Sequence, residues 1–176
     1  MKKQVSAWPF LLLSVVIVII DQVVKHWVRG NIALYEEISF IPGVLGLTYF
    51  QNTGAAFSSF ANMTGLLTGI SVVVSIALVV IIWRRVMPDF LGMLALSLVL
   101  GGAVGNCIDR ALLGYVVDMF RTEFMNFAVF NVADIGVSIG GVLLCVYVLF
   151  FWKEGKKEKA EQSEEEPIAS EEAGEL

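Results

Sequence analysis

Residues 133–152 read ADIGVSIGGVLLCVYVLFFW, an apolar run in which the only charged residue is Asp134, next to its start. A helix rises about 1.5 Å per residue, so about 17 to 25 apolar residues are needed to cross a hydrocarbon core of about 30 Å. The run from Ala133 to Trp152 meets this length, as do Trp8 to Val28, Leu66 to Trp83 and Phe90 to Ile108. The four runs predict an all-α integral membrane protein with four transmembrane helices.

The composition indicates the same class of protein. Hydrophobic residues make up 57% of the chain, charged residues make up 16%, and the mean hydropathy is +0.76, whereas soluble proteins average about 25% charged residues. The formal net charge of -5 comes from residues 153–176, which hold nine Glu and four Lys, because residues 1–152 carry eight charges of each sign. We therefore expect one four-helix membrane domain over residues 1–152 and a disordered acidic cytoplasmic tail over residues 153–176.

The distribution of basic residues predicts the orientation in the membrane. Lys and Arg near the ends of spanning helices favour the cytoplasmic side. They occur before the first run, between the second and third runs, and after the fourth, as Lys2, Lys3, Arg84, Arg85, Lys153, Lys156, Lys157 and Lys159. Both termini and the short middle connection should therefore be cytoplasmic, and the two longer connections, about residues 29–65 and 109–132, should face outside.

The two outer connections differ in their patterns. In the first, Glu36 to Phe40 and Val44 to Phe50 are rich in β-branched and aromatic residues, and Pro42 and Gly43 between them are a turn signal. This pattern predicts a small extracytoplasmic β element. The second connection is rich in Phe and Met and is too apolar for a solvated loop, so we expect a short interfacial helix or a flap there.

Two carboxylates, Asp118 and Asp134, bracket the second outer connection. Insertion of a carboxylate at the edge of the hydrocarbon costs about 2 to 3 kcal/mol, so the presence of each one requires a structural or functional explanation. Two Asp that share a proton split their pKa values, which leaves one as a base to activate water and the other as an acid to protonate a leaving amine. Helix capping competes as an explanation of Asp134, because Asn131 and Asp134 have the spacing of an N-cap and the third helical position. Taken alone, that spacing favours capping.

Several residues that could carry other chemistry have simpler explanations. The one His of the chain, His26, has no Cys or Asp at ligand spacing, so a metal site or a Ser-His triad is poorly supported. Cys107 and Cys145 lie in apolar runs, where a thiol behaves as a small hydrophobic group. The spacings of Gly101 to Gly105 and of Gly136 to Gly140 indicate close helix packing rather than a phosphate-binding loop.

A Ser-Lys dyad is a stronger competitor. Lys25 lies near the outer end of the first run, and Ser58 and Ser59 follow in the first outer connection. A desolvated Lys can act as the base for a Ser nucleophile. Asp21, however, lies four residues before Lys25 on the same helical face, and an ion pair between them would keep the Lys charged and hinder it as a base.

A group of further polar residues favours the paired carboxylates. Asn106, Asp109 and Arg110 are spaced three and four residues apart, so they share one face at the outer end of a helix. The whole outer set of amide, carboxylate and guanidinium groups is Asn52, Asn106, Asp109, Arg110, Asp118, Asn131 and Asp134. Such a set suits the binding of an extended peptide backbone and the polarisation of its carbonyl group. Neither a metal nor a cofactor is then required.

Five blocks of the chain resemble, in order, those of bacterial lipoprotein signal peptidase, also called signal peptidase II. They are Asp21 with Lys25, Asn52 to Phe57, Gly101 to Arg110, Val116 to Asp118, and Phe130 to Asp134. The resemblance implies an aspartic endopeptidase of the bacterial cytoplasmic (inner) membrane with its active site toward the extracytoplasmic side. Such an enzyme removes the signal peptide of diacylglyceryl-modified prolipoproteins on the amino side of the lipidated Cys.

The resemblance also implies roles for single residues. Asp118 and Asp134 match the catalytic dyad of the family. The matches to its substrate-binding residues are Asn52, Asn106, Arg110 and Asn131, and the positions that support the architecture are Asp21, Lys25, Gly54 and Asp109. The expected partners are lipid-modified prolipoproteins and membrane lipids, without a nucleic acid or a metal, and we expect a monomer.

A small ion or proton transporter is the alternative function, in which carboxylates at membrane depth relay protons. It is disfavoured because the second apolar run has no acidic residue, and the acidic residues of the other three cluster toward one side of the membrane. A purely structural membrane scaffold would leave the paired Asp residues without a purpose.

Overall fold

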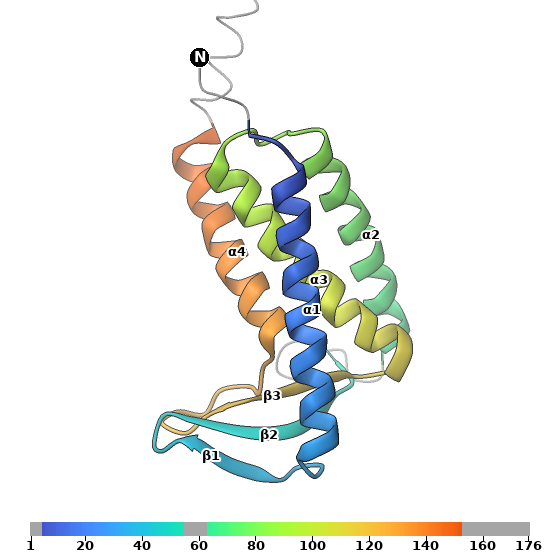
Figure 1. The fold of residues 1–176 in the computed structure, drawn as a ribbon, viewed down its shortest axis with the longest axis vertical. Coiled ribbons are helices and arrows are strands. Elements are labelled where there is room, and N and C mark those ends of the chain that lie inside the picture. The colour runs from blue at the N-terminus through green and yellow to red at the C-terminus, as the bar shows by residue number, and fades with distance from the viewer. Residues whose placement is uncertain (1–4, 55–62, 153–176) are drawn as a thin grey trace, which may run out of the picture.

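The computed structural model describes residues 5–54 and 63–152. Its four long helices are α1 (Trp8–Asn31), α2 (Thr64–Trp83), α3 (Phe90–Leu113) and α4 (Val132–Phe150), and each is long and apolar enough to cross a membrane. The predicted four-helix membrane bundle is confirmed (Figure 1). The predicted tail, residues 153–176, lies outside the described residues.

A small antiparallel sheet lies across one end of the bundle, here called the sheet end (Figure 1). Its strands are β1 (Glu37–Ile41), β2 (Leu45–Asn52) and β3 (Val116–Thr122), in the order β1-β2-β3. The hairpin of the first two strands confirms the predicted β element. The third strand was not predicted, and it changes the expected path of the second outer connection.

The second connection begins with the last residues of α3, which are followed by β3, and residues 114–131 contain no helix. The chain then turns back and runs extended along β3, where the backbone of Phe130 exchanges hydrogen bonds of 2.8 and 3.1 Å with that of Phe120. Of the two predicted forms, a helix is therefore wrong, and the segment is a flap that folds back on the sheet. Asp118 consequently lies on a strand.

The helix α3 is the centre of the bundle and packs against the other three helices. In its most apolar stretch 56% of the residues are buried, against 22% or less in the other spans. It also extends beyond the predicted end at Ile108 to Leu113, where Gly114 ends it with a left-handed φ of 80°. Because of this extension, Asp109 and Arg110 lie within the helix, as Asn106 does, near the sheet end of the bundle.

Glycines let α4 approach α3 closely, as their spacing predicts. A Cβ atom at Gly140 would lie 2.8 Å from the carbonyl oxygen of Ala95 and 2.8 Å from a methyl group of Val99. A Cβ atom at Gly102 would collide with the carbonyl oxygen of Ala133. The first turn of α4, which carries Asp134, therefore lies directly against the backbone of α3.

The neighbouring glycines of α4 provide a matched test of this packing. We expect Gly140→Ala to lower the free energy of unfolding by about 1 to 3 kcal/mol, because the added methyl overpacks the contact with α3. Gly141→Ala should leave it unchanged or raise it by up to about 1 kcal/mol, because a methyl group there would have no atom of the described residues within 4 Å and Ala favours the helix. Unfolding in detergent measures both, and equal effects would contradict the close contact.

Candidate active site

The two predicted carboxylates come from different elements and meet at one cavity. Asp118 is the third residue of β3 and is 1% exposed. Asp134 is in the first turn of α4, three residues after the N-cap Asn131. Both carboxylates line a cavity of about 450 Å³ at the sheet end of the bundle.

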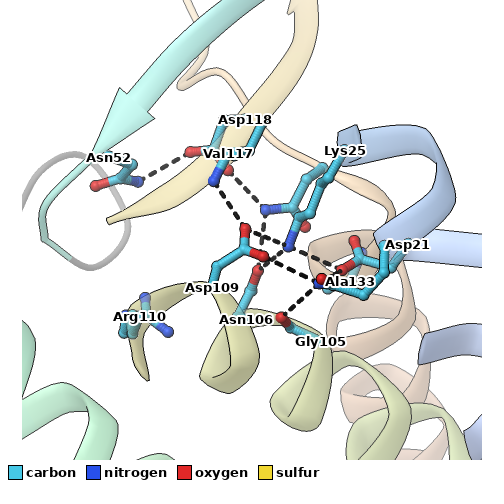
Figure 2. A network of polar contacts seen from close by, with 12 residues as sticks. Asp21, Lys25, Asn52, Gly105, Asn106, Asp109, Arg110, Val117, Asp118 and Ala133 are labelled. Atoms are coloured by element: carbon cyan, nitrogen blue, oxygen red, sulfur yellow. Dashed lines mark hydrogen bonds and ion pairs between the residues drawn. The ribbon is translucent and has the colours of Figure 1, made fainter. Parts of the chain in front are cut away.

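Two amide side chains hold the carboxylate of Asp118. Asn52 at the end of β2 donates a hydrogen bond of 3.0 Å to Oδ2, and Asn131 donates one of 2.6 Å to Oδ1. The contact with Asn52 is drawn in Figure 2. Because each oxygen accepts from a different element, the carboxylate of Asp118 has a defined orientation.

Asp134 caps its helix, as the spacing with Asn131 predicts. The backbone N–H of Asp134 donates to Oδ1 of Asn131 at 2.9 Å, and the backbone N–H of Asn131 donates to Oδ2 of Asp134 at 3.1 Å, which forms a reciprocal capping box. The other oxygen, Oδ1, accepts a hydrogen bond of 2.8 Å from Asn106 on α3. Capping therefore uses only one oxygen of this carboxylate.

Asn131 and Asn106 join the two carboxylates. The Nδ2 atom of Asn131 donates to Oδ1 of Asn106 at 3.0 Å, in addition to its bond with Asp118. The Nδ2 atom of Asn106 in turn donates to Asp134. Asn131 is fully buried and does not line the cavity, so its contacts are with the two carboxylates and not with the cavity space.

Arg110 supplies the positive charge of the cavity. One of its terminal nitrogens, Nη2, donates a hydrogen bond of 3.2 Å to the carbonyl oxygen of Gly54, and the backbone N–H of Gly54 donates to Oδ1 of Asn52 at 2.9 Å. The Nε atom of Arg110 is buried and has no hydrogen-bond partner among the described residues. The side chain of Arg110 also lines the cavity, so a cationic donor group borders the space that a ligand would occupy.

The cavity is apolar apart from this polar group. Its polar walls come from Asn52, Asn106, Arg110, Asp118, Asp134 and Ser138. The apolar walls come from β3, the flap and α4, as Val116, Phe127, Ala128, Val129, Phe130, Ile135, Val137 and Ile139. Sequence reasoning did not single out this apolar part, because a Phe or an Ile in an apolar run carries no signal that it faces a cavity.

Three of the four residues predicted to support the architecture, Asp21, Lys25 and Asp109, form a buried group next to the two carboxylates. Lys25 on α1 is 2% exposed, and its Nζ atom is 2.8 Å from Oδ2 of Asp21 and 3.1 Å from Oδ2 of Asp109. The predicted ion pair of Asp21 and Lys25 is confirmed. Ser58 and Ser59 of the competing Ser-Lys dyad lie outside the described residues, but the donors of Lys25 are occupied by these two carboxylates and by Asn106.

Gln22 is a member of this group that sequence reasoning missed. Its Nε2 atom is 3.2 Å from Oδ2 of Asp21, 3.0 Å from Oδ1 of Asp109 and 3.1 Å from the carbonyl oxygen of Gly105. Its position directly after Asp21 was the only available signal. His26 is exposed and lines a small second pocket of about 80 Å³ between α1, α3 and β3. The described residues include no group of three His, Cys, Asp or Glu that could hold a metal ion.

Burial changes the protonation of Asp118. Desolvation in the strand, together with the negative charge of Asp134, raises the pKa of Asp118 from its ordinary value of 3.8 to about 7. The hydrogen bonds from Asn52 and Asn131 and the charge of Lys25 act in the opposite direction but do not outweigh burial. At neutral pH this carboxyl group can therefore carry a proton that an exposed Asp would have lost.

The fold and the cavity define a class: a four-helix membrane protein with two linked carboxyl groups that are suited to acid–base chemistry. Comparison with known proteins agrees with this class. A family model for signal peptidase (SPase) II matches residues 13–150. The chain belongs to the signal peptidase II family and is a multi-pass membrane peptidase.

Two relatives and one solved structure illustrate the similarity. The lipoprotein signal peptidase of Lactococcus lactis subsp. lactis (strain IL1403) is 40% identical over 149 residues, which cover 85% of this chain and 96% of that protein. That of Streptococcus thermophilus (strain CNRZ 1066) is 44% identical over 135 residues, which cover 77% and 86%. A bacterial membrane enzyme solved by the in meso method at 2.3 Å resolution has a TM-score of 0.79 and 32% identity, covering 85% of this chain and 92% of that chain.

The raised pKa of Asp118 predicts how stability depends on pH. Asp118 binds its proton more tightly in the folded protein than in the unfolded chain, so its contribution to the free energy of unfolding decreases as pH rises from about 4 to about 7. Asp118→Asn cannot titrate and lacks this dependence. We therefore expect the Tm of the parent, relative to that of Asp118→Asn, to fall across this interval and to level off above it. Thermal unfolding in detergent at several pH values measures the difference, and parallel curves would contradict the raised pKa.

Proposed function

We propose that the chain is an aspartic endopeptidase that cleaves the signal peptide from diacylglyceryl-modified prolipoproteins on the amino side of the lipidated Cys. The observation that carries the proposal is the pair Asp118 and Asp134, joined through Asn131 at one cavity. The substrate follows from the relatives, which are lipoprotein signal peptidases.

The surroundings of the two carboxyl groups differ, which supports different roles. Asp134 lies at the positive end of the dipole of α4 and accepts hydrogen bonds from Asn106 and from the backbone of Asn131. We assign to it the ionised carboxylate, which is the general base. Asp118 is buried in a strand, and its pKa of about 7 makes it the proton-carrying partner, the general acid.

The reaction then proceeds by four proton transfers, two on formation of the tetrahedral intermediate and two on its breakdown. Asp134 removes a proton from a water molecule, the water oxygen forms a bond to the scissile carbonyl carbon, and Asp118 gives its proton to the carbonyl oxygen. The resulting tetrahedral intermediate breaks its C–N bond as Asp134 passes the proton to the leaving amine. Asp118 recovers its proton from a hydroxyl group as the carboxyl product forms, so both groups return to their starting states.

The remaining polar groups suit substrate binding. The guanidinium group of Arg110 lines the cavity and can donate to a backbone carbonyl of the substrate. Asn52 and Asn106 line the same cavity and, while holding the two Asp residues, border the space where the peptide would lie. An extended peptide between these groups would bring its scissile bond to the pair of carboxyl groups.

The apolar walls suit the lipid of the substrate. Ile135 and Ile139 on α4 line the cavity and are 39% and 50% exposed, and they belong to a helix apolar enough to span the membrane. In the proposed binding mode the cavity borders the bilayer, and acyl chains stay in lipid while the peptide reaches Asp118 and Asp134. With both termini cytoplasmic, as the basic residues indicate, the sheet end and the cavity face the extracytoplasmic side. Membrane lipids and prolipoproteins are the partners, and the enzyme acts as a monomer.

Replacement of each carboxylate tests the aspartic mechanism. Asp118→Asn and Asp134→Asn keep the shape and much of the hydrogen bonding of Asp but cannot transfer the proton, so kcat should fall by about 1,000-fold or more while the protein still inserts. Cleavage of a lipid-modified precursor by purified variants measures this.

A matched control separates catalysis from capping. Asp89 is the N-cap of α3 and lies at the end of the bundle opposite the sheet, so Asp89→Asn should retain turnover. If Asp134 only caps α4, Asp134→Asn should cost about 1 kcal/mol of stability and little activity. Substantial cleavage by a well-inserted Asp134→Asn variant would leave Asp118 without a partner and refute the aspartic mechanism.

Comparison of two precursors tests the substrate assignment. Since part of the binding energy should come from acyl chains held at the bilayer edge, an unlipidated precursor of the same sequence should be cleaved with a kcat/KM lower by about 100-fold. Purified enzyme in lipid nanodiscs and quantified products provide the measurement. Equal cleavage of both precursors would reduce the proposal to a general intramembrane aspartic protease.

A further inference from the structure

A cluster of buried charges lies directly behind the two carboxyl groups of the site. It consists of Asp21, Lys25 and Asp109, whose side chains are 0%, 2% and 3% exposed. Removing ions from water costs about as much as their attraction returns, and apolar replacement of such clusters is often neutral or stabilising. A contribution to stability is therefore a weak explanation for this cluster. Its contacts with the elements that carry Asp118 and Asp134 suggest a role in the site.

One carboxylate of the cluster holds the strand that carries Asp118. The backbone N–H of Val117, one residue before Asp118, donates a hydrogen bond of 2.9 Å to Oδ2 of Asp109 (Figure 2). The same oxygen is 3.1 Å from Nζ of Lys25. The position of β3 at Asp118 is thus coupled to the ammonium group of α1.

The other carboxylate holds the helix that carries Asp134. The backbone N–H of Ala133, one residue before Asp134, donates a hydrogen bond of 2.9 Å to Oδ1 of Asp21 (Figure 2). This N–H is one of the first-turn donors that have no partner within the helix itself. Because Oδ2 of Asp21 is 2.8 Å from Nζ of Lys25, the start of α4 is coupled to the same ammonium group.

Lys25 also fixes the amide between the two carboxyl groups. Its third contact is a hydrogen bond of 3.0 Å donated to Oδ1 of Asn106. An ammonium group donates and never accepts, so the amide oxygen must face Lys25 and the amide nitrogen must face Asp134. That nitrogen donates to Oδ1 of Asp134 at 2.8 Å. A reversed amide would set two donors against each other.

We propose that the cluster of Asp21, Lys25 and Asp109 is a positioning element that sets the distance and the relative orientation of Asp118 and Asp134. The proposal rests on the catalytic roles proposed above for these two residues. The two backbone anchors share one ammonium group, so a displacement at Lys25 shifts the strand and the helix relative to each other. A displacement of about 1 Å between reacting groups can cost about 100-fold in rate.

Two substitutions that keep the charges but change their reach test the proposal. Lys25→Arg has a wider cation, and Asp109→Glu moves its carboxylate outward by one methylene. We expect each to lower kcat by about 10- to 100-fold, to change KM by less than about 3-fold and to lower Tm by only a few degrees, because substrate contacts are intact while the two carboxyl groups are displaced. The assay is cleavage of a lipid-modified precursor by the folded fraction.

A hydrogen bond at the opposite end of the same helix pair is the matched control. Tyr147 on α4 donates a bond of 2.8 Å to Asp89 at the start of α3. Tyr147→Phe removes this tie between α3 and α4, so it should lower Tm without changing the kcat of the folded enzyme. If Lys25→Arg and Asp109→Glu show the same behaviour, with lower Tm and unchanged kcat, the cluster is only structural and the proposal is overturned.

If neither Lys25→Arg nor Asp109→Glu folds, Gln22→Met tests whether the cluster positions the two carboxyl groups. The side chain of Gln22 is half-buried and bonds to both Asp21 and Asp109, so Met keeps its size and leaves all three charges in place. A kcat lower by about 3- to 10-fold at unchanged Tm would support positioning, and an unchanged kcat would overturn it. A failure of the proposed function would be seen in a different experiment, because Asp118→Asn or Asp134→Asn would then retain turnover.

Discussion

The amide of Asn131 is the contact on which the geometry of the site depends. Its Nδ2 atom donates to Asp118 at 2.6 Å and to Asn106 at 3.0 Å, and its Oδ1 atom accepts from the backbone of Asp134 at 2.9 Å. A strand and a helix that lie at opposite ends of one connection are thus joined by a single buried side chain. Neither of its two N–H donors is left over, so a change at any partner would leave a buried polar atom unpaired. Such an atom is costly where no water can reach it.

The polar network of the site depends on close helix packing, because it forms only if α1 and α4 come very close to α3. Glycines permit this approach. A Cβ atom at Gly105 would lie 2.7 Å from Oδ2 of Asp21, and one at Gly102 would collide with the carbonyl oxygen of Ala133. The same positions that bring the helices together therefore bring the carboxylate of α1 within reach of the first turn of α4. Larger residues in α3 would separate the charges as well as the helices.

The sequence predicts the spans, the first hairpin and the polar residues of the site, but not every contact among them. Apolar length and turn signals are local, so they identify α1 to α4 and the β1–β2 hairpin. The strand β3 was missed because it pairs with β2, which is distant in sequence, and its Phe-rich continuation resembled an interfacial segment. The backbone N–H groups of Val117 and Ala133 were missed for another reason: a main-chain donor has no signature in the residue type. The position of Gln22 directly after Asp21 was too weak a signal, because a Gln beside an Asp on a helix is ordinary.

Capping and catalysis looked like competing explanations for Asp134, and the geometry makes them compatible. The capping box occupies Oδ2 and holds the side chain in one orientation, while Oδ1 bonds to Asn106 and the residue lines the cavity. A general base needs a fixed position and must be ionised, and the first turn of a helix favours both. Under the proposed mechanism the cap is therefore part of what prepares the base. An N-cap motif beside a membrane surface is, on its own, no argument against a catalytic role. The discriminating feature is a second carboxyl group at the same cavity, which Asp118 supplies.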